Sequence, residues 1–242
     1  MIRIDITLSS DFPIVLPVHY NEHIQALVYH HLDPDVARKL HDEGFRYGKR
    51  RFKLFTFSRI FGRGRYDRKN RLLTFPPRIR IAFAFAVESI GRSFLDRMVR
   101  SDPIVLEGNL LKVAETRITI PKVGRKVKVK TLSPITVYRT VPEGGRRRTV
   151  YFPPDSPEFA GLVKMNLLRK YETLYGREYS GGLEVHTLQK GRMAIVKYKG
   201  TVIKAWDGTF LLRGEPDILR LALGAGLGAK NSHGFGMVTE IT

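Results

Sequence analysis

The 242-residue sequence contains no cysteine, which excludes disulfide bonds, thiolate zinc sites and thiol nucleophiles. It has no apolar run near the ~20 residues that a transmembrane helix needs. Its first residues alternate charged and apolar side chains and lack the apolar core of a signal peptide. These absences predict a soluble, cytoplasmic protein that has no membrane partner.

Acidic residues are also scarce, with 23 Asp and Glu against 42 Lys and Arg, so the net charge is +19. Both halves of the chain are basic, which argues against a neutral domain with one basic arm. No helical segment combines a basic face with a broad aromatic face, so nucleic acid is favoured over a membrane surface. The densest basic clusters lie among glycines at residues 46–53, 63–71, 122–130 and 146–148.

The first half of the chain has the periodicities of a β-α-β-β-α-β unit. Asn21 is the expected N-cap of the first helix. Asp33-Pro34 and Gly44 are the expected start and end of a second short helix. In the first helix the apolar face includes His31 and leaves Tyr29 to one side, which from the pattern alone favours an ordinary surface aromatic over a residue that points to a cleft. The expected strands are 2–8, 52–61, 78–87 and 104–118, and the expected helices are 21–32, 33–43 and 87–98.

The second half repeats this order, which predicts an α+β fold of two tandem ferredoxin-like (βαββαβ) domains with a C-terminal glycine-rich loop. The expected domains are 1–120 and 126–242, joined through 121–125. The expected strands are 127–140, 149–152, 183–188, 193–198, 201–212 and 235–241, with helices opened by Pro157 and Pro216.

Five of the thirteen residues from Gly224 to Gly236 are glycines. Such a segment allows a ligand to approach the backbone closely, and Lys230 adds a cation for phosphate. The spacing matches neither a Walker A loop nor a dinucleotide fingerprint. A helix cap and a tight turn explain Gly224 but not the other four glycines, so a functional loop is favoured.

This loop, Gly226-x-Gly228-x5-Gly234-x-Gly236, resembles the C-terminal glycine-rich loop of the repeat-associated RNA-binding (RAMP) superfamily. Within it, the chain resembles the CRISPR-associated endoribonucleases that cut precursor CRISPR RNA within its repeats. The likeness covers nearly the whole chain and is carried by Leu27-Val28-Tyr29, Leu40-His41, Lys53-Leu54-Phe55-Thr56-Phe57-Ser58, Thr131-Leu132-Ser133-Pro134-Ile135 and Asn231-Ser232-His233-Gly234-Phe235-Gly236-Met237-Val238.

The resemblance implies metal-independent cleavage by the substrate's own 2′-OH, without a cofactor, leaving 5′-OH and 2′,3′-cyclic phosphate ends. It implies Tyr29, His41 and Lys53 as the catalytic residues. A histidine suits proton transfer near neutral pH, a tyrosine mainly orients the hydroxyl, and a lysine stabilises the phosphorane charge. His30 remains an alternative acid. Lys49, Arg50 and Arg51 compete with Lys53 for the cationic role, because the span after His41 is longer and more basic than the family minimum.

The expected partner is CRISPR repeat RNA, and a CRISPR effector complex and a second copy of the chain are further candidates. The alternative function is a non-catalytic RAMP-type RNA-binding subunit of such a complex. No carboxylate cluster has metal-ligand spacing, so no metal site is expected. The expected RNA-binding residues are Gly226, Gly228, Lys230, Asn231, Ser232, His233, Gly234, Gly236, Arg50, Arg51, Lys126, Lys128 and Lys130.

Overall fold

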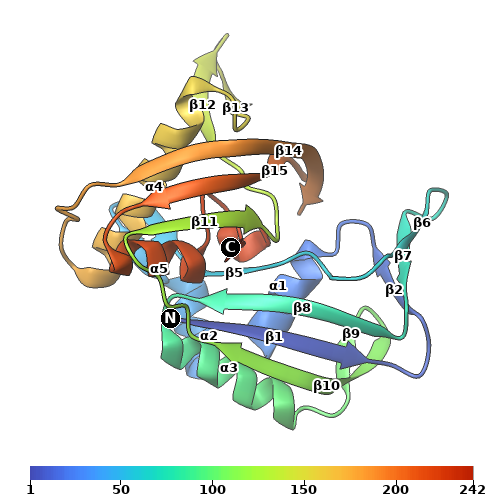
Figure 1. Ribbon diagram of the computed structural model, residues 1–242. Coiled ribbons are helices and arrows are strands. Elements are labelled where there is room, and N and C mark those ends of the chain that lie inside the picture. The colour runs from blue at the N-terminus through green and yellow to red at the C-terminus, as the bar shows by residue number, and fades with distance from the viewer. Residues whose placement is uncertain (242) are drawn as a thin grey trace.

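The computed structural model describes residues 1–241, and its two largest β-sheets lie one above the other in Figure 1. The first sheet has the order β5-β8-β1-β10-β9. In β1 the even-numbered isoleucines and Leu8 are buried against the helices, as alternation predicts. The elements of this unit are β1 (Ile2–Ser9), α1 (Asn21–His30), α2 (Pro34–Asp42), β5 (Phe55–Phe57), β8 (Arg78–Phe85), α3 (Glu88–Arg100), β9 (Ile104–Leu106) and β10 (Asn109–Thr119).

The second sheet has the order β14-β15-β11-β16. In both units, the four strands of the βαββαβ pattern lie in the order second, third, first, fourth, which confirms the tandem ferredoxin-like fold. The elements are β11 (Lys126–Thr131), α4 (Pro157–Tyr175), β14 (Glu184–Tyr198), β15 (Thr201–Arg213), α5 (Pro216–Ala225), the 3₁₀ helix η1 (Asn231–His233) and β16 (Val238–Glu240).

Several predicted strands have other limits in the structure. The predicted strand 52–61 is broken at Leu54, which has a φ of +53°, and only β5 belongs to the sheet. The predicted strand 127–140 ends at Thr131, and residues 138–143 belong to a separate hairpin. The expected strands 183–188 and 193–198 form one continuous strand, and the last strand is limited to β16. The two hairpins are β3 (Phe45–Tyr47) with β4 (Arg50–Phe52), and β12 (Tyr138–Glu143) with β13 (Arg146–Tyr151).

A small sheet that the sequence did not predict extends the first unit beyond β8 (Figure 1). Its strands are β2 (Ile14–Pro17), β7 (Leu72–Phe75) and β6 (Arg65–Asp67). Each is only three or four residues long, too short for a clear alternation of apolar and polar side chains. No helix in residues 1–241 is long and apolar enough to cross a membrane.

Polar contacts to the C-terminal segment join the two units. Asn21 is the first residue of α1, not its N-cap, and its amide donates to the backbone oxygen of His233 at 2.8 Å. The buried Thr56 hydroxyl donates to the backbone oxygen of Phe235 at 2.9 Å. These bonds hold the C-terminal loop against the first helix and β5 of the N-terminal unit.

Candidate functional site

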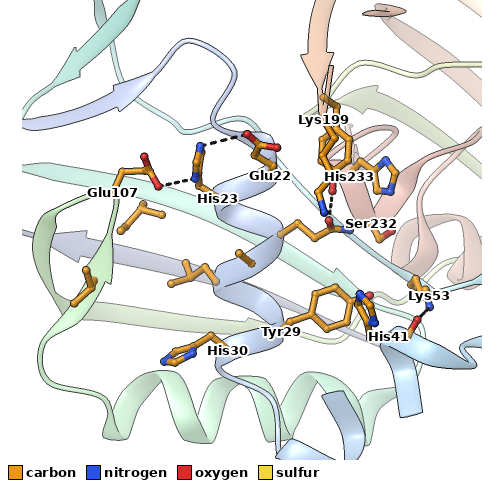
Figure 2. Close-up of a pocket in the computed structure, with 16 residues that line it drawn as sticks. Glu22, His23, Tyr29, His30, His41, Lys53, Glu107, Lys199, Ser232 and His233 are labelled. Atoms are coloured by element: carbon orange, nitrogen blue, oxygen red, sulfur yellow. Dashed lines mark hydrogen bonds and ion pairs between the residues drawn. The ribbon is translucent and has the colours of Figure 1, made fainter. Parts of the chain in front are cut away.

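A cavity of about 940 Å³ opens between α1, the end of α2, the β14–β15 turn and η1. Tyr29, His41 and Lys53 all line it, although they come from α1, α2 and the segment between β4 and β5 (Figure 2). The structure therefore brings the three predicted catalytic side chains together.

Tyr29 lies at the wall of this cavity, packed edge-on against two rings. Its ring centroid is 5.5 Å from that of His41 and 5.9 Å from that of Phe55. Burial raises the pKa of Tyr29 well above its ordinary value, and the nearby Tyr198 adds to the rise. The phenol therefore stays protonated at neutral pH and can donate a hydrogen bond. His31 is buried, in agreement with the helical spacing.

His41 occupies the last turn of α2, and its side chain is 71% exposed. Its Nδ1 lies 2.9 Å from Oδ1 of Asp42. This hydrogen bond is the main reason that the pKa of Asp42 is lowered. The carboxylate fixes one edge of the imidazole and leaves the ring accessible to a substrate.

Lys53 closes the C-terminal end of α2. Its Nζ donates to the backbone oxygens of Leu40 and His41, which are among the last carbonyls of the helix and have no partner within it. Burial lowers the pKa of Lys53, and the charge of Arg51 lowers it further. The ammonium thus lies beside the backbone of the predicted acid.

The rival cations occupy other places. Arg51 donates to the backbone oxygen of Asp42 at 2.6 Å, so it also holds the end of α2. Arg50 lines a neighbouring cavity, and the exposed Lys49 lines neither cavity. Lys53 is the cation of this cluster that lines both cavities.

His30 lines the same cavity but lies across α1 from His41 and Lys53 (Figure 2). Its ring centroid is 5.1 Å from that of His31. The carboxylates of the cavity lie at the other end of α1, where His23 Nδ1 is 2.6 Å from a carboxylate oxygen of Glu107 and its Nε2 is 3.7 Å from one of Glu22. The opposite end, at Lys53, is cationic.

A second cavity of about 780 Å³ continues from that cationic end, and the two cavities share Lys53, Ser232 and His233. It forms a basic groove lined by Arg50, Arg51, Arg139, Arg169 and Lys230. Arg139 and Arg169 could not be selected from the sequence because they lie far apart in it, on β12 and α4. Only the tertiary fold brings them together.

The glycine-rich loop is not the open cradle that the sequence suggested. Gly226, Gly228, Gly234 and Gly236 are buried and all have positive φ. A Cβ on Gly236 would lie 1.9 Å from the backbone oxygen of Leu227. Internal packing therefore accounts for these glycines. Ser232, His233 and Lys230 are partly exposed and face the cavities, whereas Asn231 is buried and donates to Leu227 and Phe235.

A fully buried lysine supports this loop. Lys170 of α4 donates to the backbone oxygens of Gly226 and Gly228 at 2.7 and 3.1 Å. Burial lowers the pKa of Lys170 to about 7. The lysine nitrogen thus supplies the hydrogen-bond donor for the inward-facing carbonyls of Gly226 and Gly228.

Lys126, Lys128 and Lys130 occupy the exposed face of β11 and alternate with buried valines. None of the three lines either cavity, so the fold does not bring them to the catalytic set. Within residues 1–241, no three His, Asp or Glu side chains come together in a way that could hold a metal ion.

Several known proteins that are similar in sequence or structure are described as Cas6. A family model described as "CRISPR associated protein Cas6, C-terminal" matches residues 117–240. The CRISPR-associated endoribonuclease Cas6 1 of Methanocaldococcus jannaschii is 26% identical over 99% of this chain and 92% of its own. The CRISPR-associated endoribonuclease Cas6 of Pyrococcus furiosus is 29% identical over 95% of this chain and 85% of its own. A solved structure of a CRISPR-associated protein Cas6 is 25% identical, has a TM-score of 0.81 and covers 100% of this chain and 99% of its own.

Proposed function

Because the chain belongs to the Cas6 family of CRISPR-associated proteins, we propose that it is a metal-independent endoribonuclease that cuts precursor CRISPR RNA within its repeats. The observation that carries the proposal is the meeting of Tyr29, His41 and Lys53 in one cavity that continues into a basic groove. Two relatives along nearly its whole length are endoribonucleases of this family.

In the proposed reaction, the ribose 2′-oxygen forms a bond to the scissile phosphorus and the bond from phosphorus to the 5′-oxygen breaks. His41 protonates the leaving 5′-oxygen, because its exposed imidazole can reach substrate. Tyr29 stays a phenol and holds the attacking 2′-hydroxyl in line, and the proton of that hydroxyl passes to solvent. Lys53 stabilises the extra negative charge on the phosphoryl oxygens. The products are a 2′,3′-cyclic phosphate and a 5′-OH.

The charge distribution supports a direction for the RNA. The carboxylates of Glu22 and Glu107 repel phosphate at one end of the catalytic cavity. Arg139, Arg169 and Lys230 attract it in the groove at the other end. The strand is therefore proposed to leave the cavity past Lys53 along this groove. The lysines of β11 bind RNA, if at all, on a separate face.

Incubation of the protein with repeat RNA in the presence of a chelator tests this function. We expect cleavage at one position and the two product ends given above. Loss of cleavage in chelator with rescue by magnesium would contradict the metal-independent mechanism, and 5′-phosphate ends would indicate an activated water. Binding without cleavage under all conditions would identify the non-catalytic RNA-binding subunit. Sedimentation with and without RNA tests whether a second copy takes part.

A further inference from the structure

An aromatic pair closes the wall of the catalytic cavity that the C-terminal unit provides. The ring of Tyr198, at the end of β14, stacks on the ring of His233 in η1, with centroids 4.1 Å apart and planes 7° apart. The Tyr198 hydroxyl donates to Gln25 of α1. The pair thus lies against α1, the helix that carries Tyr29, and both rings line the cavity.

His233 is not suited to proton transfer. Burial, together with the charges of Lys230 and Lys199, lowers the pKa of His233 to about 4, so the ring is neutral at pH 7. Its Nδ1 is buried and has no hydrogen-bond partner in the described part of the chain. A neutral, flat ring at this place can act by contact but not as a general acid.

The ring is not needed to shape the loop. The backbone of His233 is already fixed, because its N–H donates to the backbone oxygen of Lys230 and its carbonyl accepts from Asn21. An apolar side chain would pack against Tyr198 without leaving a nitrogen unpaired. The unpaired imidazole nitrogen therefore points to a ligand that a planar polar ring can contact.

The position of the pair fits one ligand class. His233 and Ser232 lie at the junction of the catalytic cavity and the basic groove. Lys199 lines the first cavity, together with Glu22, and Lys230 lines the second, so the pair has a cation on each side. Planar rings between phosphate-binding cations are the usual platform for unpaired bases.

We propose that the partly exposed ring of His233, backed by the buried ring of Tyr198, forms a nucleobase-stacking subsite that holds the base of a nucleotide next to the scissile phosphate. This inference rests on the proposed RNA-cleaving function and adds a binding role for the C-terminal unit. Stacking accepts any base, because every base has a π-face, so the subsite orients the strand more than it reads sequence. A base held there draws its ribose and phosphate toward Tyr29 and Lys53.

The test combines protein variants with RNA that lacks single bases. The probe is repeat RNA from the CRISPR array of the same genome, with a 2′-deoxy group at the cleavage position so that it binds without being cut. Abasic sites are placed one at a time on either side of the scissile bond. Affinity is measured for wild type, Tyr198→Leu and His233→Leu, and thermal unfolding checks that each variant folds.

We expect one abasic position to weaken wild-type binding by about 5- to 150-fold, the effect of one stacked base. Each leucine variant should weaken binding of intact RNA by a similar factor and show little further weakening when that base is absent. Tyr198→Phe keeps the platform and removes only the bond to Gln25, so it should retain the dependence on the base. If the leucine variants fail to fold, the abasic scan of wild type still decides, because the absence of any position with such a loss would overturn the subsite.

Tyr175→Leu is the matched control. Tyr175 packs on Tyr171 at the far end of α4, with centroids 4.5 Å apart, and lines neither cavity. It should bind intact and abasic RNA as wild type does. The subsite would be overturned if removal of the base weakened binding by the same factor in wild type and in the leucine variants. Unchanged affinity of both leucine variants for intact RNA would also overturn it. Because the binding probe cannot be cut, the subsite is tested separately from catalysis, which cleavage of the unmodified RNA reports.

Discussion

The two βαββαβ units have the same strand order but place polar residues differently. In the N-terminal unit, the candidate chemistry lies on helix ends and connections, where His41 and Lys53 remain partly exposed. In the C-terminal unit, Lys170 is fully buried and His233 is partly buried, and both have lowered pKa values. The comparison teaches that one scaffold can supply reactive groups from one copy and a rigid wall from the other.

The largest expected effect concerns the exposed histidine of the N-terminal unit. His41→Ala should lower single-turnover cleavage by about 10²- to 10⁴-fold, because general acid catalysis contributes that much. RNA affinity should change little beside the many Lys and Arg contacts. His30→Ala is the control, since His30 lines the same cavity on the other side of α1. A silent His41→Ala with an inactive His30→Ala would move the acid to α1.

The second effect concerns the rigidity of the C-terminal loop. Gly236→Ala should lower the free energy of unfolding by about 2 kcal/mol or more, because the residue has a φ of +73° and its Cβ would overlap Leu227. Gly161→Ala in α4 meets nothing within 4 Å and should raise it by about 0.5–1 kcal/mol. Denaturant unfolding measures both. Equal stability of the two variants would mean that the loop is not close-packed.

The third effect concerns the basic groove between the units. Replacing Arg139 and Arg169 by Gln should weaken RNA binding and reduce the slope of log affinity against log salt by about 0.7 for each phosphate that is no longer neutralised. Arg92→Gln with Arg100→Gln removes the same charge from α3, where both side chains are paired with acids. This control should keep the slope. An equal change in both double variants would assign the effect to net charge alone.

The smallest expected effect is the contribution of Lys170 to the pH dependence of the free energy of unfolding. Its pKa is about 7 in the folded chain and ordinarily 10.5. Between these values the unfolded chain binds a proton that the folded chain does not, so the free energy of unfolding rises with pH. Lys170→Met removes this effect. The free energy of unfolding of wild type, relative to that of the variant, should therefore increase between pH 7 and 8.5. A constant difference between the two free energies would contradict the lowered pKa of Lys170.

Both ferredoxin-like units were predictable because their strands and helices have regular apolar periods, as in β1 and α4. The limits of β5 were not, because Leu54 adopts a positive φ that only its tertiary surroundings impose. Asn21 resembles a helix cap locally, yet it bonds to His233, 212 residues away. The roles of Tyr29, His41 and Lys53 and the domain division at 121–125 remain predictions.

The close packing around the buried glycines could not be predicted for a similar reason. The glycine content predicts positive φ angles. It does not say whether the space beside each glycine, where a Cβ would lie, is occupied by a ligand or by another segment of the chain. Gly228, for example, approaches the backbone oxygen of Thr136, and Gly234 approaches the ring of Phe57. Nothing in the residues next to Tyr198 marks it as part of the site. It is the last residue of β14, and the ring on which it stacks belongs to His233, 35 residues later in the sequence.

The hydrogen bond from Tyr198 to Gln25 also joins the two halves of the chain at the cavity, which matters during synthesis. Ribosomes make the half that carries Tyr29, His41 and Lys53 first, when the opposite wall of the cavity does not yet exist. An incomplete chain, or one cut by a protease between the halves, would hold its reactive groups without a place to seat a strand. In the proposed function, cleavage therefore requires both halves of the chain, because neither half alone forms the cavity.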